Sequence, residues 1–193
     1  PVEQHYIQFD GLTSYAYAPL AAQGVKDTLG WTLVLKVADR IASVFKHYGL
    51  VYDSTAAAQL AQCSTLYSGD DAREVWAVGF SETSGALYDH RGTDATTGES
   101  VVSLYHRDTV TRRVDLRMVK GGATLQSQGG NFSKSEARTP LHVGLGAHVY
   151  VSSGVHTPQG GSYGAAKIIA AALVRDEATE AELQAYSQVR DAR

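Results

Sequence analysis

The sequence predicts an all-β protein, a two-sheet antiparallel β-sandwich with a short helix near its C-terminal end. Two observations lead to this prediction. Short apolar runs recur between glycine-rich or polar clusters in a chain with 19 glycines among 193 residues, and this rhythm is typical of a sandwich or barrel. Near the end, Thr179 and Glu182 form a T-x-x-E capping box before an apolar-spaced run, which predicts one helix.

Composition limits the classes of protein and partner. The length fits one domain over residues 1–193, and no repeat, linker or charge block divides it. The 17 basic and 20 acidic residues give a net charge of −3 without a basic stripe, so no nucleic-acid partner is expected. No apolar run approaches the ~18 residues of a membrane span, so membrane insertion is not expected. The single cysteine, Cys63, excludes an internal disulfide.

The opening stretch YIQFDGLTSYAYAP, residues 6–19, predicts two short strands in a hairpin that turns at Asp10–Gly11. This dipeptide tolerates the positive φ that tight hairpin turns need. Tyr15 and Tyr17 would share one face of the second strand. Pro19 cannot donate to a sheet, so it ends the strand or lies on an edge.

Apolar alternation predicts the strands of the middle of the chain. Residues 31–38 alternate clearly, and 43–49 are the expected partner strand. Residues 73–80 are apolar on both faces, as a central strand would be. Residues 99–107 and 112–119 would form two strands that flank a polar turn.

The remaining segments differ in the strength of their signals. Residues 141–151 are predicted as one strand, and 165–174 as another, because isoleucine, valine and the preceding glycines favour a strand over a helix. The helix would run from about Glu180 towards Arg190. Residues 52–70 are poor in strand signal, and their alanines could form a short helical turn or an ordered loop. Residues 119–130 are expected to be a hairpin loop.

Both ends of the chain resemble one known family. Phe9-Asp10-Gly11, Tyr17-Ala18-Pro19 and Trp31-Thr32-Leu33 look like the start of a laminin G-like, concanavalin A-type domain. LHVGLG at residues 141–146 and the segment 164–186 resemble its closing strands and short acidic helix. The resemblance implies a jelly roll whose N- and C-terminal segments pair in one sheet. Residues 40–130 match only in strand rhythm, and residues 166–172 are richer in alanine than the family pattern.

Folds of this type host lectins, adhesion modules, glycoside hydrolases and polysaccharide lyases, so the fold does not choose a function. A glycosidase needs two carboxylates that flank the bond, and only Asp115 lies well inside a predicted strand. The strand with Arg113, Asp115 and Arg117 resembles the R-x-E-x-R strand of alginate lyase-type jelly rolls, with Asp in place of Glu. Its two guanidinium groups could hold the carboxylate of a uronate. The other two lyase strand motifs are absent, so a solvated ion-pair ladder with all three charges facing water is favoured.

The candidate metal and sugar ligands come from turns and strand ends. The seven histidines lack helical i, i+4 pairing, so no histidine metal site is expected. Calcium is commoner in the family, and Asp89, Asp94 and Glu99 in a predicted polar loop, residues 88–100, would bind it, although an ordinary turn is favoured. The candidate glycan-binding residues combine aromatic and planar polar side chains: Tyr48, Tyr88, Asp89, His106, Arg113, Asp115, Arg117 and Tyr163.

The prediction for function is a non-catalytic surface-recognition module that binds a glycan or a protein surface in adhesion or attachment. One alternative is a structural component of a larger particle, such as a viral capsid decoration or tail protein, and a second is a polysaccharide lyase. Only 19% of the residues in the chain are charged, and a surface low in charge suits burial against copies of the chain, which predicts a homo-oligomer or lattice. An extracellular surface or a virion is the expected location.

Overall fold

The computed structural model describes most of the chain in ten ranges. For the strands at 62–68, 75–81 and 85–92 it describes the backbone alone. The described ranges are 6–19, 30–40, 47–52, 62–68, 75–81, 85–92, 99–107, 113–131, 142–152 and 155–189.

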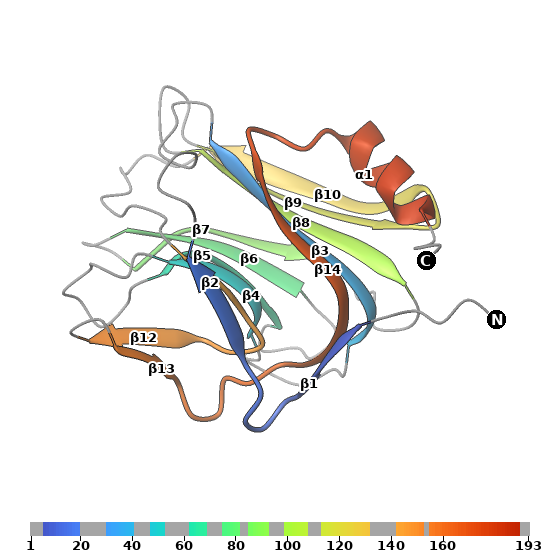
Figure 1. Ribbon diagram of the computed structural model, residues 1–193. Coiled ribbons are helices and arrows are strands. Elements are labelled where there is room, and N and C mark those ends of the chain that lie inside the picture. Colours follow the sequence, from blue (N-terminus) through green and yellow to red (C-terminus); the bar gives the residue numbers. More distant parts are fainter. Residues whose placement is uncertain are drawn as a thin grey trace.

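Strands dominate the fold, and one helix follows the last of them (Figure 1). The elements are β1 (Ile7–Asp10), β2 (Ala16–Pro19), β3 (Trp31–Arg40), β4 (His47–Tyr52), β5 (Gln62–Ser68), β6 (Val75–Ser81), β7 (Gly85–Gly92), β8 (Ser100–Arg107), β9 (Arg113–Lys120), β10 (Ala123–Asn131), β11 (His142–Leu145), β12 (Val149–Ser152), β13 (Val155–Pro158), β14 (Ala165–Arg175) and α1 (Glu180–Gln188).

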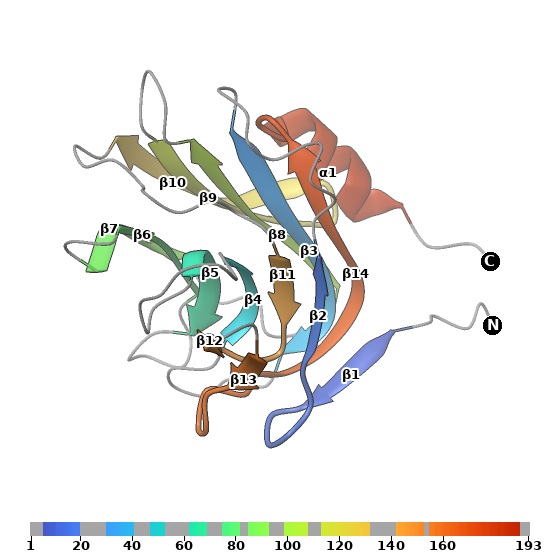
Figure 2. The ribbon, with the colours of Figure 1, turned by 60° about the vertical axis from the view of Figure 1, so that its left-hand side comes forward.

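Two six-stranded antiparallel sheets form the sandwich that the sequence predicted. Sheet A has the order β1-β14-β3-β8-β9-β10, and sheet B has the order β2-β11-β4-β5-β6-β7. A separate two-stranded hairpin, β12–β13, lies beside β2 and β4 in both views (Figures 1 and 2). No helix among the described residues is long and apolar enough to cross a membrane.

The core fills the space between the two sheets, and alternation on β3 explains why. Trp31, Leu33 and Leu35 are buried at one face of β3, and they pack with Val51 of β4 from the opposite sheet. Gly49 marks how closely the sheets approach, because a Cβ there would lie 2.8 Å from the Leu35 side chain. Alternate residues of both sheets therefore share one apolar layer.

The predicted opening hairpin is wrong, although the predicted pairing of the chain ends is confirmed. β1 pairs with β14 in sheet A, whereas β2 pairs with β11 in sheet B, so the turn carries the chain from one sheet to the other. Asp10 forms that turn: its Oδ1 accepts hydrogen bonds from the backbone N–H groups of Leu12, Thr13 and Ser14. These bonds hold the pKa of Asp10 well below its ordinary value.

The predicted strand 141–151 is instead two strands that face different layers. Gly146 interrupts it with a φ of +83°, and a Cβ there would lie 2.3 Å from the Phe9 ring, so a side chain would not fit. Before the break, Val143 and Leu145 pack on the core between the sheets. After it, Val149 packs in a second cluster with Leu50 and Val151 on the other side of sheet B. Alternation alone continues through the break and hides it.

Three further predictions of middle elements need correction. The strand predicted at 43–49 is not the partner of the strand at 31–38. β3 pairs with β14 and β8, whereas β4 belongs to sheet B. Residues 41–46 lie outside the described ranges. The weak segment 52–70 contains β5. In 119–130, only Gly121–Gly122 form a turn, with φ of +58° and +83°, and β10 follows at once. Glycine and glutamine obscured β10, which pairs with β9 along its length.

Helix α1 begins where the capping box predicted it. The Thr179 hydroxyl accepts from the backbone N–H of Glu182, and the Glu182 carboxylate accepts from the backbone N–H of Thr179. Leu183, at 2% exposure, packs with Val34 and Val101 on the outer face of sheet A. Figure 1 shows α1 lying against the β8–β9–β10 side of the sandwich. The helix therefore covers part of one outer face.

Candidate functional site

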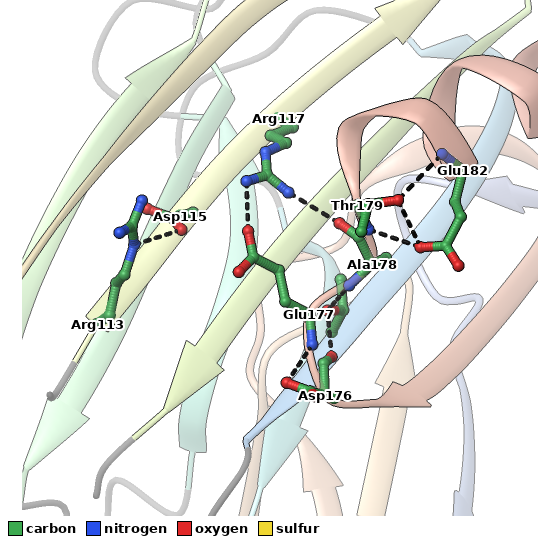
Figure 3. Close-up of polar contacts among 9 residues, drawn as sticks. Arg113, Asp115, Arg117, Asp176, Glu177, Ala178, Thr179 and Glu182 are labelled. Carbon is green, nitrogen blue, oxygen red and sulfur yellow. Dashed lines mark hydrogen bonds and ion pairs between the residues drawn. The ribbon is translucent and has the colours of Figure 1, made fainter. Parts of the chain in front are cut away.

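The three alternating charges of β9 lie on the outer face of sheet A, where α1 also packs (Figure 3). Leu116 and Met118, which alternate with these charged residues along β9, are fully buried in the core. Because side chains alternate along a strand, Arg113, Asp115 and Arg117 must point to the opposite side. The predicted sharing of one face is therefore confirmed by the geometry.

The first pair on this face joins a buried carboxylate to an exposed guanidinium. Asp115 is 3% exposed, and its Oδ2 accepts a hydrogen bond from Arg113 Nε at 2.7 Å. The Arg113 side chain is 45% exposed, so the rest of its guanidinium reaches solvent. The hydrogen bond to Asp115 raises the pKa of Arg113 above its ordinary value, which keeps this group a cation.

Gly129 makes room for the Asp115 carboxylate. It lies opposite Asp115 in the β9–β10 pairing, and a Cβ there would be 1.4 Å from Asp115 Oδ1. That oxygen is buried and has no hydrogen-bond partner among the described residues. A glycine in the middle of a strand commonly marks such a close approach.

Arg117 has a structural role instead of an open guanidinium. Its Nη1 donates to the Ala178 carbonyl at 2.8 Å, and its Nη2 pairs with Glu177 Oε1 at 2.5 Å (Figure 3). The side chain is 13% exposed. The predicted ladder with all three charges facing water is therefore wrong at Arg117, which the β14–α1 connection covers, and at Asp115, which is 3% exposed.

The segment that binds Arg117 is itself fixed to β3. The Thr32 hydroxyl donates to the Asp176 carbonyl at 2.7 Å and accepts from the Ala178 backbone N–H at 2.9 Å. Asp176 has a φ of +68°, which turns the chain out of β14 towards α1. The two terminal nitrogens of Arg117 thus anchor the start of the helix. They are not available to hold a uronate carboxylate together with Arg113.

The other predicted glycan-binding residues lie elsewhere. Tyr48 is 3% exposed and belongs to the core. Tyr163 is partly buried in the segment before β14. Tyr88 and Asp89 lie on β7 of sheet B and His106 lies on β8 of sheet A, but their side chains are outside the description. The predicted set therefore does not form one described cluster.

The predicted calcium ligands are placed only in part. Asp89 belongs to β7, so the polar loop does not extend over the whole of 88–100, and Asp94 lies outside the described ranges. The Glu99 carboxylate lies 2.6 Å from the Lys36 ammonium. Within the described residues, no three His, Cys, Asp or Glu side chains gather in a way that could hold a metal ion. Calcium binding stays a prediction.

A cluster of four rings on sheet B was not singled out from the sequence. It is formed by Tyr15 and Tyr17 at β2, His142 of β11 and His156 of β13. The shared face of Tyr15 and Tyr17 was visible as alternation in the sequence. The contact of Tyr17 with His142 and His156 depends on how strands distant in sequence are brought together, and a local sequence pattern does not predict that.

Comparison with known proteins identifies the fold. No protein-family model matches the chain, and no curated protein does so either. Among solved structures, the CBM40 of the Ruminococcus gnavus IT-sialidase bound to α2,3-sialyllactose is 17% identical, with a TM-score of 0.59, and the match covers 86% of this chain and 85% of that one. The native heptameric SAP-like pentraxin from Limulus polyphemus is 10% identical, with a TM-score of 0.58 and coverage of 90% and 80%.

A third similar structure is the binding domain of botulinum neurotoxin serotype D, at 6% identity and a TM-score of 0.54. That match covers 93% of this chain and 41% of the other. No family is established by these identities, so the narrower laminin G-like resemblance stays a prediction. The described part of this chain has two six-stranded antiparallel sheets followed by one short helix, α1, which matches a β-sandwich jelly roll. The chain has a jelly-roll β-sandwich fold, similar to that of the CBM40 and of the pentraxin.

Proposed function

We propose that this domain is a non-catalytic glycan-binding module and that Arg113 binds an acidic group of the glycan. The observation that supports this most directly is the 2.7 Å contact between Arg113 Nε and Asp115 Oδ2. It fixes the guanidinium by its inner nitrogen, and 45% of the side chain remains exposed. The ligand end of the arginine is therefore ordered before binding, which lowers the entropy lost on association.

The chemistry of a fixed guanidinium suits a carboxylate. Its planar fork places two N–H donors side by side, which matches the two oxygens of a sugar carboxylate. The R. gnavus CBM40 of similar fold was solved with sialyllactose, whose sialic acid carries such a group. This is support by analogy of fold, and the assignment to Arg113 comes from the geometry of β9.

The contacts of Arg117 favour a role in binding over a role in cleavage. A lyase built on this strand would use both guanidiniums to hold a uronate, and Arg117 uses its two terminal nitrogens on Glu177 and Ala178. One open cation can bind a carboxylate. We therefore expect binding without turnover.

The test compares acidic and neutral sugars on matched variants. Isothermal titration with 3′-sialyllactose, trigalacturonic acid and lactose would measure affinity, and chromatography of the mixtures would detect cleavage. Arg113→Gln should weaken binding of an acidic sugar by about tenfold or more, since a charge-assisted bidentate contact is lost. Arg175→Gln, the same change at another exposed arginine of sheet A, should leave it unchanged.

Other outcomes would contradict this assignment. Equal binding by Arg113→Gln and the unmodified protein would remove Arg113 from the site. Lack of binding to both acidic sugars would argue against an acidic-glycan module. Cleavage products that disappear in Arg113→Gln would show a lyase instead.

A further inference from the structure

The four-ring cluster of Tyr15, Tyr17, His142 and His156 lies on the outer face of sheet B. Ala16, between the two tyrosines, packs on the core, so both tyrosines point outward. On β11, Val143 packs on the same core and His142 therefore also points outward. Three strands that are remote in sequence, β2, β11 and β13, thus bring their rings together on this face.

Three of the four rings in this array, those of Tyr15, Tyr17 and His156, are nearly parallel, and His142 stands across them. Tyr17 stacks on His156 with ring centroids 4.4 Å apart and planes 5° apart. Tyr15 lies 6.3 Å from Tyr17 with planes 13° apart. His142 meets His156 edge to face at 4.8 Å. Aromatic pairs in these arrangements attract one another beyond simple burial, so the array is ordered without a ligand.

The hairpin that carries His156 is fastened to the rest of the domain by its own contacts. The backbone N–H of Gln159 donates to the His148 carbonyl at 2.8 Å, and the backbone N–H of His148 donates to the Ser162 hydroxyl at 2.9 Å. Val149 and Val151 are buried against Leu50 of β4. His156 is consequently held over Tyr17 by a packed element.

The array remains open to solvent despite this order. Tyr17 is 47% exposed and Tyr15 is 36% exposed. The four side chains contain phenol and imidazole groups but no carboxylate or ammonium. Stacking covers one face of Tyr17 and one of His156. The ring faces that remain, with hydroxyl and N–H groups at their edges, complement a ring that has C–H groups on one face and hydroxyls around it. A pyranose has this combination, and none of these four side chains is a carboxylate or an ammonium that would select a charged ligand.

We propose that Tyr15, Tyr17, His142 and His156 form a second carbohydrate site, which takes the apolar face of a neutral pyranose. Arg113 lies on the outer face of sheet A, and this array lies on the outer face of sheet B. The two sites are therefore separated by the whole sandwich. One molecule can therefore hold an acidic and a neutral sugar unit at the same time, and because the two sites face opposite ways it would link two separate glycans.

The test uses saturation-transfer NMR with lactose, maltohexaose and cellohexaose as neutral probes. We expect transfer to ring C–H protons of at least one probe, and a loss of affinity of about tenfold or more in Tyr17→Ala. Tyr6→Ala is the matched control, because Tyr6 is 45% exposed and lies at sheet A beside Lys167. Tyr17→Phe keeps the ring and should keep the binding. Arg113→Gln should leave the neutral probes unaffected, which separates this site from the acidic one.

The same experiment can overturn the proposal. No transfer to any of the three probes, or equal transfer in Tyr17→Ala, would show that the array is not a sugar site. An oligomer that Tyr17→Ala dissociates in size-exclusion chromatography would make the array a contact between copies of the chain. If Tyr17→Ala does not fold, as judged by its melting temperature against Tyr6→Ala, Tyr15→Ala takes its place, with the same expected loss.

Discussion

The ammonium nitrogen of Lys36 lies 2.6 Å from a carboxylate oxygen of Glu99 at the outer face of sheet A. Lys36 is 1% exposed and Glu99 is 25% exposed. The ammonium also donates to the Val189 carbonyl at the end of α1 and lies 5.2 Å from the centre of the Tyr186 ring. One buried cation therefore joins β3, the entry to β8 and the end of the helix.

Removal of the anion should cost more than removal of the cation. In Glu99→Gln the buried ammonium loses its carboxylate, and we expect the free energy of unfolding to fall by about 1–3 kcal/mol. In Lys36→Met the charge disappears and the apolar stem keeps its volume, so the loss should be smaller than in Glu99→Gln. Urea unfolding of both variants measures this, and the reverse order would contradict the role of the pair.

Glu99 was also a predicted calcium ligand, and Lys36 bears on that prediction. A calcium ion at Glu99 has to compete with the ammonium for the same carboxylate. We expect Ca²⁺ to bind there no more tightly than about the millimolar range of the weaker protein sites. Calorimetric titration of the chelator-treated protein checks this, and micromolar binding that Glu99→Gln abolishes would contradict it.

Gly129→Ala should destabilise the β9–β10 pair. The added Cβ would be placed 1.4 Å from Asp115 Oδ1, so the carboxylate or the strand must shift, which disturbs the contact with Arg113. We expect a loss of about 2 kcal/mol in the free energy of unfolding, as for other overpacked positions. The control is Gly160→Ala, since a Cβ at Gly160 would have no atom within 4 Å. Equal stability of the two variants in urea would show that the strand adapts freely.

Both arginines of β9 should contribute to stability, for different reasons. Arg117→Gln removes the contacts with Glu177 and Ala178 that fasten the β14–α1 connection, and we expect a loss of about 2 kcal/mol. Arg113→Gln leaves the Asp115 carboxylate, which is 3% exposed, without its cation, and we expect a loss of about 1–3 kcal/mol. Differential scanning calorimetry measures both losses, and a variant that melts with the unmodified protein would contradict the role given to its arginine.

His148 should make stability depend on pH. Burial lowers its pKa below the ordinary 6.5, so the unfolded chain takes up a proton at a higher pH than the folded protein does. Stability is then complete above 6.5 and falls as the pH drops from 6.5 towards the lowered folded pKa. His148→Gln cannot titrate, and its urea midpoint should vary less over this window. An unchanged pH slope in the variant would contradict the prediction.

The sequence predicted the elements with strong local signals. The alternation of Trp31, Leu33 and Leu35 gave β3 its buried face, and the Thr179–Glu182 box gave α1 its first turn. The pairing of β1 with β14 followed from the family resemblance. These features depend on neighbouring residues or on a motif, so a single sequence contains them.

The wrong predictions share one cause, because contacts between residues distant in sequence decide those features. Asp10–Gly11 reads as a hairpin turn, but β1 and β2 choose partners in different sheets. Arg117 has the residue type of a solvated charge, yet residues 176–178 of the β14–α1 connection fold over it. The partner strands, and the segment that covers a face, are fixed only when the whole sandwich is assembled.

The pairing of Ile7 with Ile168 has a consequence for how this protein forms. Of the described strands β1 is made first, yet the strand that pairs with it among them is β14, which is made last. Closing so large a loop is entropically costly, and such topologies fold slowly. Until β14 arrives, the edge of β3 that it will cover is open to other chains. We expect the nascent protein to depend on chaperones most during this interval.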